Sequence, residues 1–166
     1  MTTNNKEYSI VPLHRRPELI KDCCILLNSE WPRSETARLE SLTVSCDKFP
    51  TCLILINKEN RVLGHCKISL IPKLRHSCFI QSVIIDYKCR SQGLGSRLLH
   101  GAEDYVKRRG FKNVYLTTKA FTKSKLKEKS IQFSGPPPPP MPNFRMPKFY
   151  DFNAIAHRTH MVKTLQ

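Results

Sequence analysis

Acidic side chains are scarce in this sequence: 13 Asp and Glu stand against 28 Lys and Arg, giving a formal net charge of +15. The imbalance lies mostly in residues 88–166, which carry 16 basic and 4 acidic side chains, whereas residues 1–87 carry 12 and 9. A basic surface attracts nucleic acid, acidic protein segments or phosphorylated ligands. Nucleic acid is the least favoured of the three, because the Lys-rich stretch 119–130 contains no recognisable nucleic-acid-binding module.

Long apolar runs are also missing. No stretch approaches the roughly 18 residues that a membrane-spanning helix needs. Residues 1–13 lack a basic segment followed by an apolar run, so no secretory signal is evident. We therefore expect a cytoplasmic protein that does not contact membranes.

Cysteine is present without the spacing of a metal site or a disulfide framework. The seven cysteines are odd in number, and none are spaced as C-x-x-C. His157 and His160 have no acidic or cysteine partner at ligand spacing. We expect reduced, mostly buried thiols and no metal.

The 40% of hydrophobic residues is enough for one domain with a single core. Residues 51–57 and 62–71 indicate a hairpin, and residues 78–86 a further buried strand. The helix 91–109 would connect this strand to a parallel strand at 113–118. Periodicity and turn residues also predict a strand at 8–13, helices at 16–28 and 34–42, and one last strand within 157–165.

The stretch R-S-Q-G-L-G, residues 90–95, lies between the predicted strand 78–86 and the helix that follows. A glycine turn at a helix N-terminus exposes free N–H groups and favours an anion, so phosphate is the expected ligand. The spacing matches neither G-x-x-x-x-G-K-[ST] nor G-x-G-x-x-G, because Leu98 stands where the third glycine would be. On the glycines alone, an ordinary helix start with a tight turn is the favoured interpretation.

Arg90-x-x-Gly93-x-Gly95 resembles the [RQ]-x-x-G-x-[GA] signature of the GNAT N-acetyltransferases, and the order of elements over about 10–118 also matches. The resemblance implies an α/β fold, described also as an α+β sandwich, with a mixed sheet flanked by helices. It implies acetyl-CoA as co-substrate, with its pyrophosphate at the turn and its pantetheine arm along the preceding strand. The residues that would bind it are Val83, Ile84, Ile85, Arg90, Ser91, Gln92, Gly93, Leu94, Gly95 and Ser96.

Residues 12–20, 28–42 and the strand FIQSVII are similar to the animal actin N-terminal acetyltransferases within that family. This resemblance implies direct transfer of acetyl to the α-amine of an acidic N-terminus, that of processed actin. Gln81 is no base, Ser82 would hold a water, and the general acid is unassigned. The implied substrate-binding residues are Trp31, Arg33, Arg38, Ser41 and Ser82, with Lys73 and Arg75 in a neighbouring connection. Trp31 is equally compatible with a core anchor, whereas for Arg33 and Arg38 the resemblance favours substrate binding slightly over a solvated surface.

A run of five prolines follows the Lys-rich stretch: Pro136, Pro137, Pro138, Pro139 and Pro140. Such a run forms an extended left-handed helix that docks in aromatic-lined grooves, although it also serves as a linker. A proline-rich segment is a feature of the actin enzymes, where it engages profilin. The resemblance therefore implies profilin as a partner.

The C-terminal part departs from the family pattern. After Thr118 the family continues with a helix that carries a phenylalanine-tyrosine pair, whereas here the only such pair is Phe149-Tyr150, beyond the prolines. We therefore expect a core at 1–118, a flexible insert at 119–148 and a tail at 149–166 that supplies a closing strand. The alternative to an active enzyme is a catalytically impaired form that acts as a profilin/actin binding module.

His65 and Cys66 are adjacent in a predicted strand and invite comparison with a nucleophile pair. No third residue is placed to orient them, and neighbouring residues of a strand face opposite sides. Packing is the favoured interpretation for both.

Overall fold

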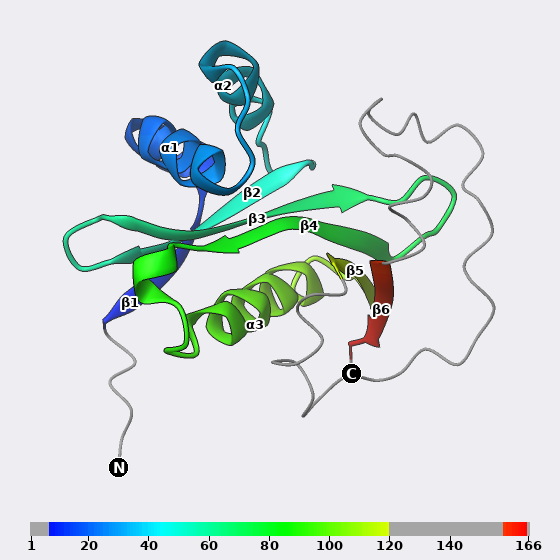
Figure 1. The fold of residues 1–166 in the computed structure, drawn as a ribbon. Coiled ribbons are helices and arrows are strands. Elements are labelled where there is room, and N and C mark those ends of the chain that lie inside the picture. Colours follow the sequence, from blue (N-terminus) through cyan, green and yellow to red (C-terminus); the bar gives the residue numbers. More distant parts are fainter. Residues whose placement is uncertain (1–6, 120–157, 166) are drawn as a thin grey trace.

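A computed structural model describes residues 7–119 and 158–165, which form a single six-stranded sheet with helices on both faces (Figure 1). The strands follow the chain in the order β1-β2-β3-β4-β5-β6, and every neighbouring pair is antiparallel except β4 and β5. The strands are β1 Tyr8–Pro12, β2 Thr51–Asn57, β3 Val62–Leu70, β4 Ser77–Ile85, β5 Asn113–Lys119 and β6 Arg158–Thr164. The α-helices are α1 Ile20–Glu30, α2 Glu35–Thr43 and α3 Leu94–Lys107. The predicted mixed sheet flanked by helices is confirmed.

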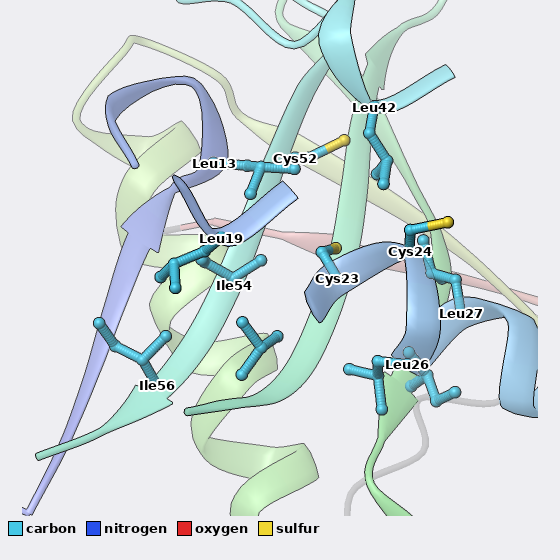
Figure 2. Packing of buried hydrophobic residues seen from close by; sticks show 12 residues of the cluster. Leu13, Leu19, Cys23, Cys24, Leu26, Leu27, Leu42, Cys52, Ile54 and Ile56 are labelled. Carbon is cyan, nitrogen blue, oxygen red and sulfur yellow. The ribbon is translucent and has the colours of Figure 1, made fainter. Parts of the chain in front are cut away.

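The two faces of the sheet carry separate cores. Helices α1 and α2 lie over one face and α3 lies under the other (Figure 1). Strand β2 is buried on both sides, so Ile54 and Ile56 face α1 while Leu53 and Leu55 face α3. Figure 2 shows the first core, in which Cys23 and Leu27 of α1 belong to one cluster with Ile54 and Ile56 of β2. The continuous apolar run of β2 therefore reflects burial on both faces.

Several predicted boundaries shift by a few residues. The helix expected from Arg16 begins only at Ile20, because Pro17–Leu19 forms a turn of 3-10 helix. The helix expected from Ser91 begins at Leu94, because Gly93 has φ +77 and cannot lie inside a right-handed helix. Ser34 caps α2 as predicted, its Oγ accepting from the Ala37 N–H at 3.3 Å.

The tail pairs with the rest of the sheet. Strand β6 runs antiparallel to β5 from Asn113↔Thr164 to Lys119↔Arg158, so the strand predicted within 157–165 is present. The Lys-rich stretch beyond Lys119, the run Pro136–Pro140 and the Phe149-Tyr150 pair lie outside the described residues.

All seven cysteines are free thiols, five of them buried. Burial raises the pKa of Cys52 to about 11 and that of Cys78 to about 12, so these thiols are protonated and unreactive at neutral pH. In residues 7–119 and 158–165, no three His, Cys, Asp or Glu side chains gather as metal ligands. Within the same ranges, none of the helices has the length and apolar character to cross a membrane.

Candidate active site

The site is built around the second half of β4, where the strand loses one of its neighbours. Strand β5 pairs with β4 only from Ser77↔Asn113 to Ile80↔Leu116, although β4 continues to Ile85. From Gln81 onward, no strand in the described part of the chain pairs with that edge of β4. Backbone N–H and C=O groups on such an edge are available to an extended ligand that carries amides of its own.

The turn that follows β4 presents a helix N-terminus beside this edge. Asp86 caps a 3-10 turn at Tyr87–Cys89, accepting from the Lys88 N–H at 3.1 Å. Ser91 and Gly93 both have positive φ, and α3 then begins at Leu94 with no side-chain cap and no acid in its first turn. The first N–H groups of α3 therefore have no competing carboxylate, and the helix dipole favours an anion there.

Arg90 ties the turn to two other elements. Its Nε donates to the carbonyl oxygen of Ile85 at 2.9 Å, and a terminal nitrogen lies 3.1 Å from Oε2 of Glu30, at the end of α1. Both side chains are about half exposed, so the ion pair contributes little by itself. The ion pair instead fixes a position: it links the turn to Glu30, the last residue before the α1–α2 connection.

The residues assigned to coenzyme A come together in space. Val83, Ile84 and Ile85 lie in the half of β4 that has β3 but not β5 as a neighbour, and the turn 90–96 follows after the 3-10 turn Tyr87–Cys89. The Cβ of a residue at position 95 would lie 3.9 Å from Cγ1 of Ile85, so the start of α3 sits over the end of the strand. Their role in binding stays a prediction.

The candidate catalytic residues lie where β4 is irregular. The β3–β4 register passes from His65↔Ile84 to Lys67↔Gln81, so two residues of β4 oppose Cys66 alone. This is a β-bulge, and Ser82 within it has φ +54. Gln81 donates its side-chain amide to Oγ of Ser69 at 3.3 Å. No residue in the described part of the chain stands out as a general acid.

Arg38 is not on a solvated surface. Its side chain is 7% exposed, its Nε donates to Oδ1 of Asn28 at 3.0 Å, and a terminal nitrogen donates to the carbonyl oxygen of Trp31. Burial, and then the nearby charge of Arg33, lower the pKa of Arg38. Among the described residues, neither arginine forms an ion pair with a carboxylate. Arg33, in the α1–α2 connection, and Arg38, on α2, are therefore neighbouring cations without an acidic partner in the described part of the chain.

The remaining candidates are more dispersed. Trp31 is partly buried and packs against the first core, so the core-anchor interpretation has support. Ser41 is half-buried on α2, while Lys73 and Arg75 are exposed in the connection before β4, at the end of that strand opposite to the glycine turn. Substrate binding by these residues stays a prediction.

Two residues of the site were missed by sequence reasoning. Glu30 gave no signal, because its partner Arg90 lies 60 positions away in the chain. His65 was assigned to packing; its signal was a polar side chain in the middle of an apolar strand, next to Gly64. The structure confirms that His65 and Cys66 face opposite sides of the sheet, since His65 lies opposite Ile54 and Cys66 belongs to the core under α3.

Comparisons with known proteins agree with this geometry. Mouse N-alpha-acetyltransferase 80 is 38% identical over 109 residues, which cover 62% of this chain and 35% of that protein. The chain thus spans about a third of the length of this curated relative. Tetrahymena GCN5 has a TM-score of 0.68 at 12% identity and covers 96% of each chain. A GNAT family N-acetyltransferase from Escherichia coli in complex with CoA has a TM-score of 0.57 at 19% identity, covering 75% of this chain and 70% of that one.

The two solved structures are below 25% identity and establish the fold. The sequence profile of the Acetyltransferase (GNAT) family matches residues 17–125, a range that includes α1 to β5 and the turn at 90–96. The chain belongs to the GNAT acetyltransferase family.

Proposed function

We propose that this chain transfers acetyl from acetyl-CoA to the α-amine of a protein with an acidic N-terminus, of the kind found in processed actin, in the cytoplasm. The observation that carries the proposal is the uncapped N-terminus of α3 beside the half of β4 that has no described strand on its β5 side. Membership of the GNAT family and the similarity to N-alpha-acetyltransferase 80 support the reaction class.

The two parts of the site suit the two chemical ends of coenzyme A. The N–H groups at the start of α3 would bind the pyrophosphate, because they combine free donors with the positive end of a helix dipole. The amide groups of the pantetheine arm would pair with the backbone of β4 from Val83 to Ile85, in the manner of an added strand. The thioester would then reach the bulge at Ser82.

Transfer at that point needs a neutral amine. The amine nitrogen attacks the thioester carbonyl carbon, a C–N bond forms, the C–S bond breaks, and the CoA sulfur leaves with the bonding electrons. One proton leaves the amine, through a water for which the Ser82 hydroxyl is the proposed holder, and the sulfur takes up a proton. A backbone N–H of β4 would stabilise the charge on the carbonyl oxygen in the transition state.

Selection for an acidic N-terminus is supported by Arg33 and Arg38. A guanidinium with little solvent exposure and no carboxylate partner among the described residues is a favourable site for an incoming acid. Arg38 already donates to the carbonyl of Trp31, so its orientation is set before any substrate arrives. Arg33 is exposed and nearby, and would contribute a second charge.

The partner assignment rests on the sequence. The run Pro136–Pro140 would dock in an aromatic-lined groove of profilin, and profilin-bound actin would thereby be presented at high effective concentration. An enzyme that has lost profilin binding would still acetylate a short acidic peptide at the original rate. Pull-down of profilin–actin by the wild-type chain, compared with a chain in which these five prolines are alanines, tests this assignment.

The function is tested by mass spectrometry of a synthetic Asp-Asp-Asp N-terminal peptide incubated with the chain and acetyl-CoA, beside a basic peptide. We expect one acetyl group on the acidic peptide only. A Gly93→Trp variant should lose the activity, because its side chain occupies the anion site. Gly110→Trp is the matched control: Gly110 also has positive φ and open space around its Cβ, but it lies at the other end of α3.

The second candidate is a module that binds profilin–actin without turnover. It is favoured by the sequence after Thr118, which lacks the phenylalanine-tyrosine pair that the family carries in the next helix. Capture of profilin–actin without acetylation of either peptide, by a chain shown to be folded, would support this second function and contradict the first.

A further inference from the structure

The bulge in β4 lies close to the point where pairing between β4 and β5 ends. It begins two residues after Ile80, the last residue of β4 that pairs with β5. On the other side, Ser82 and Val83 oppose only Cys66 of β3. The bulge therefore sets the direction in which Val83, Ile84 and Ile85 leave the paired part of the sheet. Ser82 has φ +54, a conformation that a serine holds only when its surroundings fix it.

One side chain is placed to fix it. His65 of β3 lies opposite Ile84 and is 1% exposed. Its Nδ1 is 3.0 Å from the carbonyl oxygen of Ser82. Because a carbonyl oxygen only accepts, the ring must donate through Nδ1–H, and a neutral ring then carries a bare Nε2. That Nε2 is buried and has no hydrogen-bond partner among the described residues.

The bare nitrogen argues against simple packing. An apolar side chain would fill the space between Ile54 and Ile84 without leaving a buried polar atom unpaired, which is unfavourable. The presence of a histidine at this position is explained if its Nδ1–H is needed as the donor to the Ser82 carbonyl oxygen. The carbonyl oxygen of a bulged residue is displaced from the regular ladder, and a side-chain donor from β3 replaces the missing partner.

We propose that His65 is a positioning residue, which holds the β4 bulge through its bond to the Ser82 carbonyl and so aims the backbone of Val83–Ile85 at the thioester arm. This inference rests on the proposed function of that edge as the acetyl-CoA site. His65 itself touches neither substrate nor cofactor in this account.

The protonation state of the ring agrees with this role. Burial is the main cause that lowers the pKa of His65 to about 4, while the bond to Ser82 raises it and the charges of Lys67 and Arg38 lower it further. The ring is therefore neutral at physiological pH. A neutral amide donor should be able to replace it.

The test compares three substitutions at this position by CoA affinity, kcat and thermal unfolding. His65→Asn places an amide N–H near the position of Nδ1. His65→Leu keeps the volume without a donor, and His65→Gln carries its amide about one bond too far. A control variant, Ile56→Ala, removes volume from the same core at a residue that pairs with Val62, away from the bulge.

We expect His65→Leu and His65→Gln to lower kcat/KM by roughly 100-fold, since a small displacement of reacting groups has effects of this order. His65→Asn should stay within about threefold of the wild type, and Ile56→Ala should lose stability but retain kcat. The inference is overturned if the kcat/KM of His65→Asn is no higher than that of His65→Leu. It is also overturned if Ile56→Ala loses as much kcat as a His65→Leu variant of equal stability.

A spectroscopic measurement keeps the test decisive if the variants do not fold. Long-range proton–nitrogen correlation NMR of the unliganded wild-type chain should show His65 with hydrogen on Nδ1 and no titration between about pH 5.5 and 8.5. Hydrogen on Nε2, or titration within this range, would refute the inference. Since neither this spectrum nor CoA affinity involves an acceptor peptide, failure here is separable from failure of the proposed function.

Discussion

The two halves of β4 have similar sequences and different surroundings. Residues 78–80 pair with both β3 and β5, Ser77 pairs with β5, and Cys78 and Ile80 are buried in the core under α3. Gln81–Ile85 keeps β3 on one side and has no paired strand on the other in the described part of the chain. Both halves are mainly apolar, so composition does not separate them. The position of β5 makes the first half a structural element and leaves the second half as the proposed binding edge.

The end of the molecule next to the paired half is fastened by a polar cluster around Asp47. Its Oδ1 accepts from Arg109 at 3.0 Å and lies 3.1 Å from Nε2 of His14. Arg109 also stacks on the ring of Tyr105, with its guanidinium carbon 4.4 Å from the centroid. These contacts join the α2–β2 connection to the C-terminal end of α3. The binding edge is held instead by the pair Arg90–Glu30, by the pair Arg61–Asp86 at the end of β4, and by His65.

The largest difference between the two halves of β4 is expected when a negative charge is placed at the turn 90–96 that follows the second half. Gly93→Asp should weaken CoA binding by about 1000-fold, because a like charge beside the pyrophosphate is unfavourable by several kcal/mol and each tenfold in affinity is about 1.4 kcal/mol. Gly110→Asp introduces the same residue at the other positive-φ glycine of α3 and should leave CoA affinity unchanged. Isothermal titration calorimetry measures both; equal affinities would contradict the assignment of the turn.

Substitutions in the first half of β4, residues 77–80, should change the stability of the fold and not CoA affinity. Ile80→Ala removes a side chain that is 1% exposed and should reduce the free energy of unfolding by about 3 to 4 kcal/mol. CoA affinity per folded molecule should not change. Denaturant unfolding with and without CoA measures the two effects, and a large loss of affinity in the folded variant would show that the two halves are not independent.

We expect His65, which contacts the bulge between the two halves of β4, to make the stability of the fold depend on pH. The folded-state pKa of His65 is lowered to about 4, below its unfolded value of about 6.5, so the unfolded chain binds the extra proton in this window. Stability from the neutral ring is present above about pH 6.5 and falls by about 3 kcal/mol as pH drops to 4. His65→Asn should lack this component. Unfolding curves over this range measure it, and identical curves for both chains would contradict the buried, neutral ring.

The smallest effect is expected at Asp47. Hydrogen bonding from His14, and then the charge of Arg15, lower the pKa of this carboxyl. A lowered folded-state pKa contributes stability above the unfolded value of about 3.9, and this is lost as pH falls through the folded value. Asp47→Asn should therefore lower Tm slightly at neutral pH and flatten the acid limb. Calorimetry between about pH 2 and 7 tests this, and CoA affinity should stay unchanged.

Much of this fold was predictable because its signals are local. The hairpin of β2 and β3, the cap at Ser34 and the glycine turn each depend on a few neighbouring residues, and each was found at its predicted place. The start of α3 was placed three residues early, because a positive φ at Gly93 is decided by the turn as a whole. The assignment of Val83–Ile85 and 90–96 to coenzyme A came from resemblance, and the geometry groups them as that resemblance implies.

The unpredicted features depend on residues far apart in the chain. The bulge at Ser82 arises from the register between two strands, and its link to His65 joins positions 17 residues apart. The burial of Arg38 depends on Asn28 and Trp31 of the preceding helix and its connection. The divergence of β4 and β5 after Ile80 has no signature in either strand. Such features follow from packing between elements, which a pattern along one chain does not encode.

Residue-resolved amide hydrogen exchange of this chain, with and without CoA, tests the central claim most directly. Amides of Ser77–Ile80 should be protected in both states, because β3 and β5 already pair with them. Those amides of Gln81–Ile85 that face away from β3, and the amides of residues 93–96, should gain protection only when CoA is bound. Unchanged exchange along this edge and turn, or new protection around Asp47 instead, would contradict the account of β4 as half structure and half binding site.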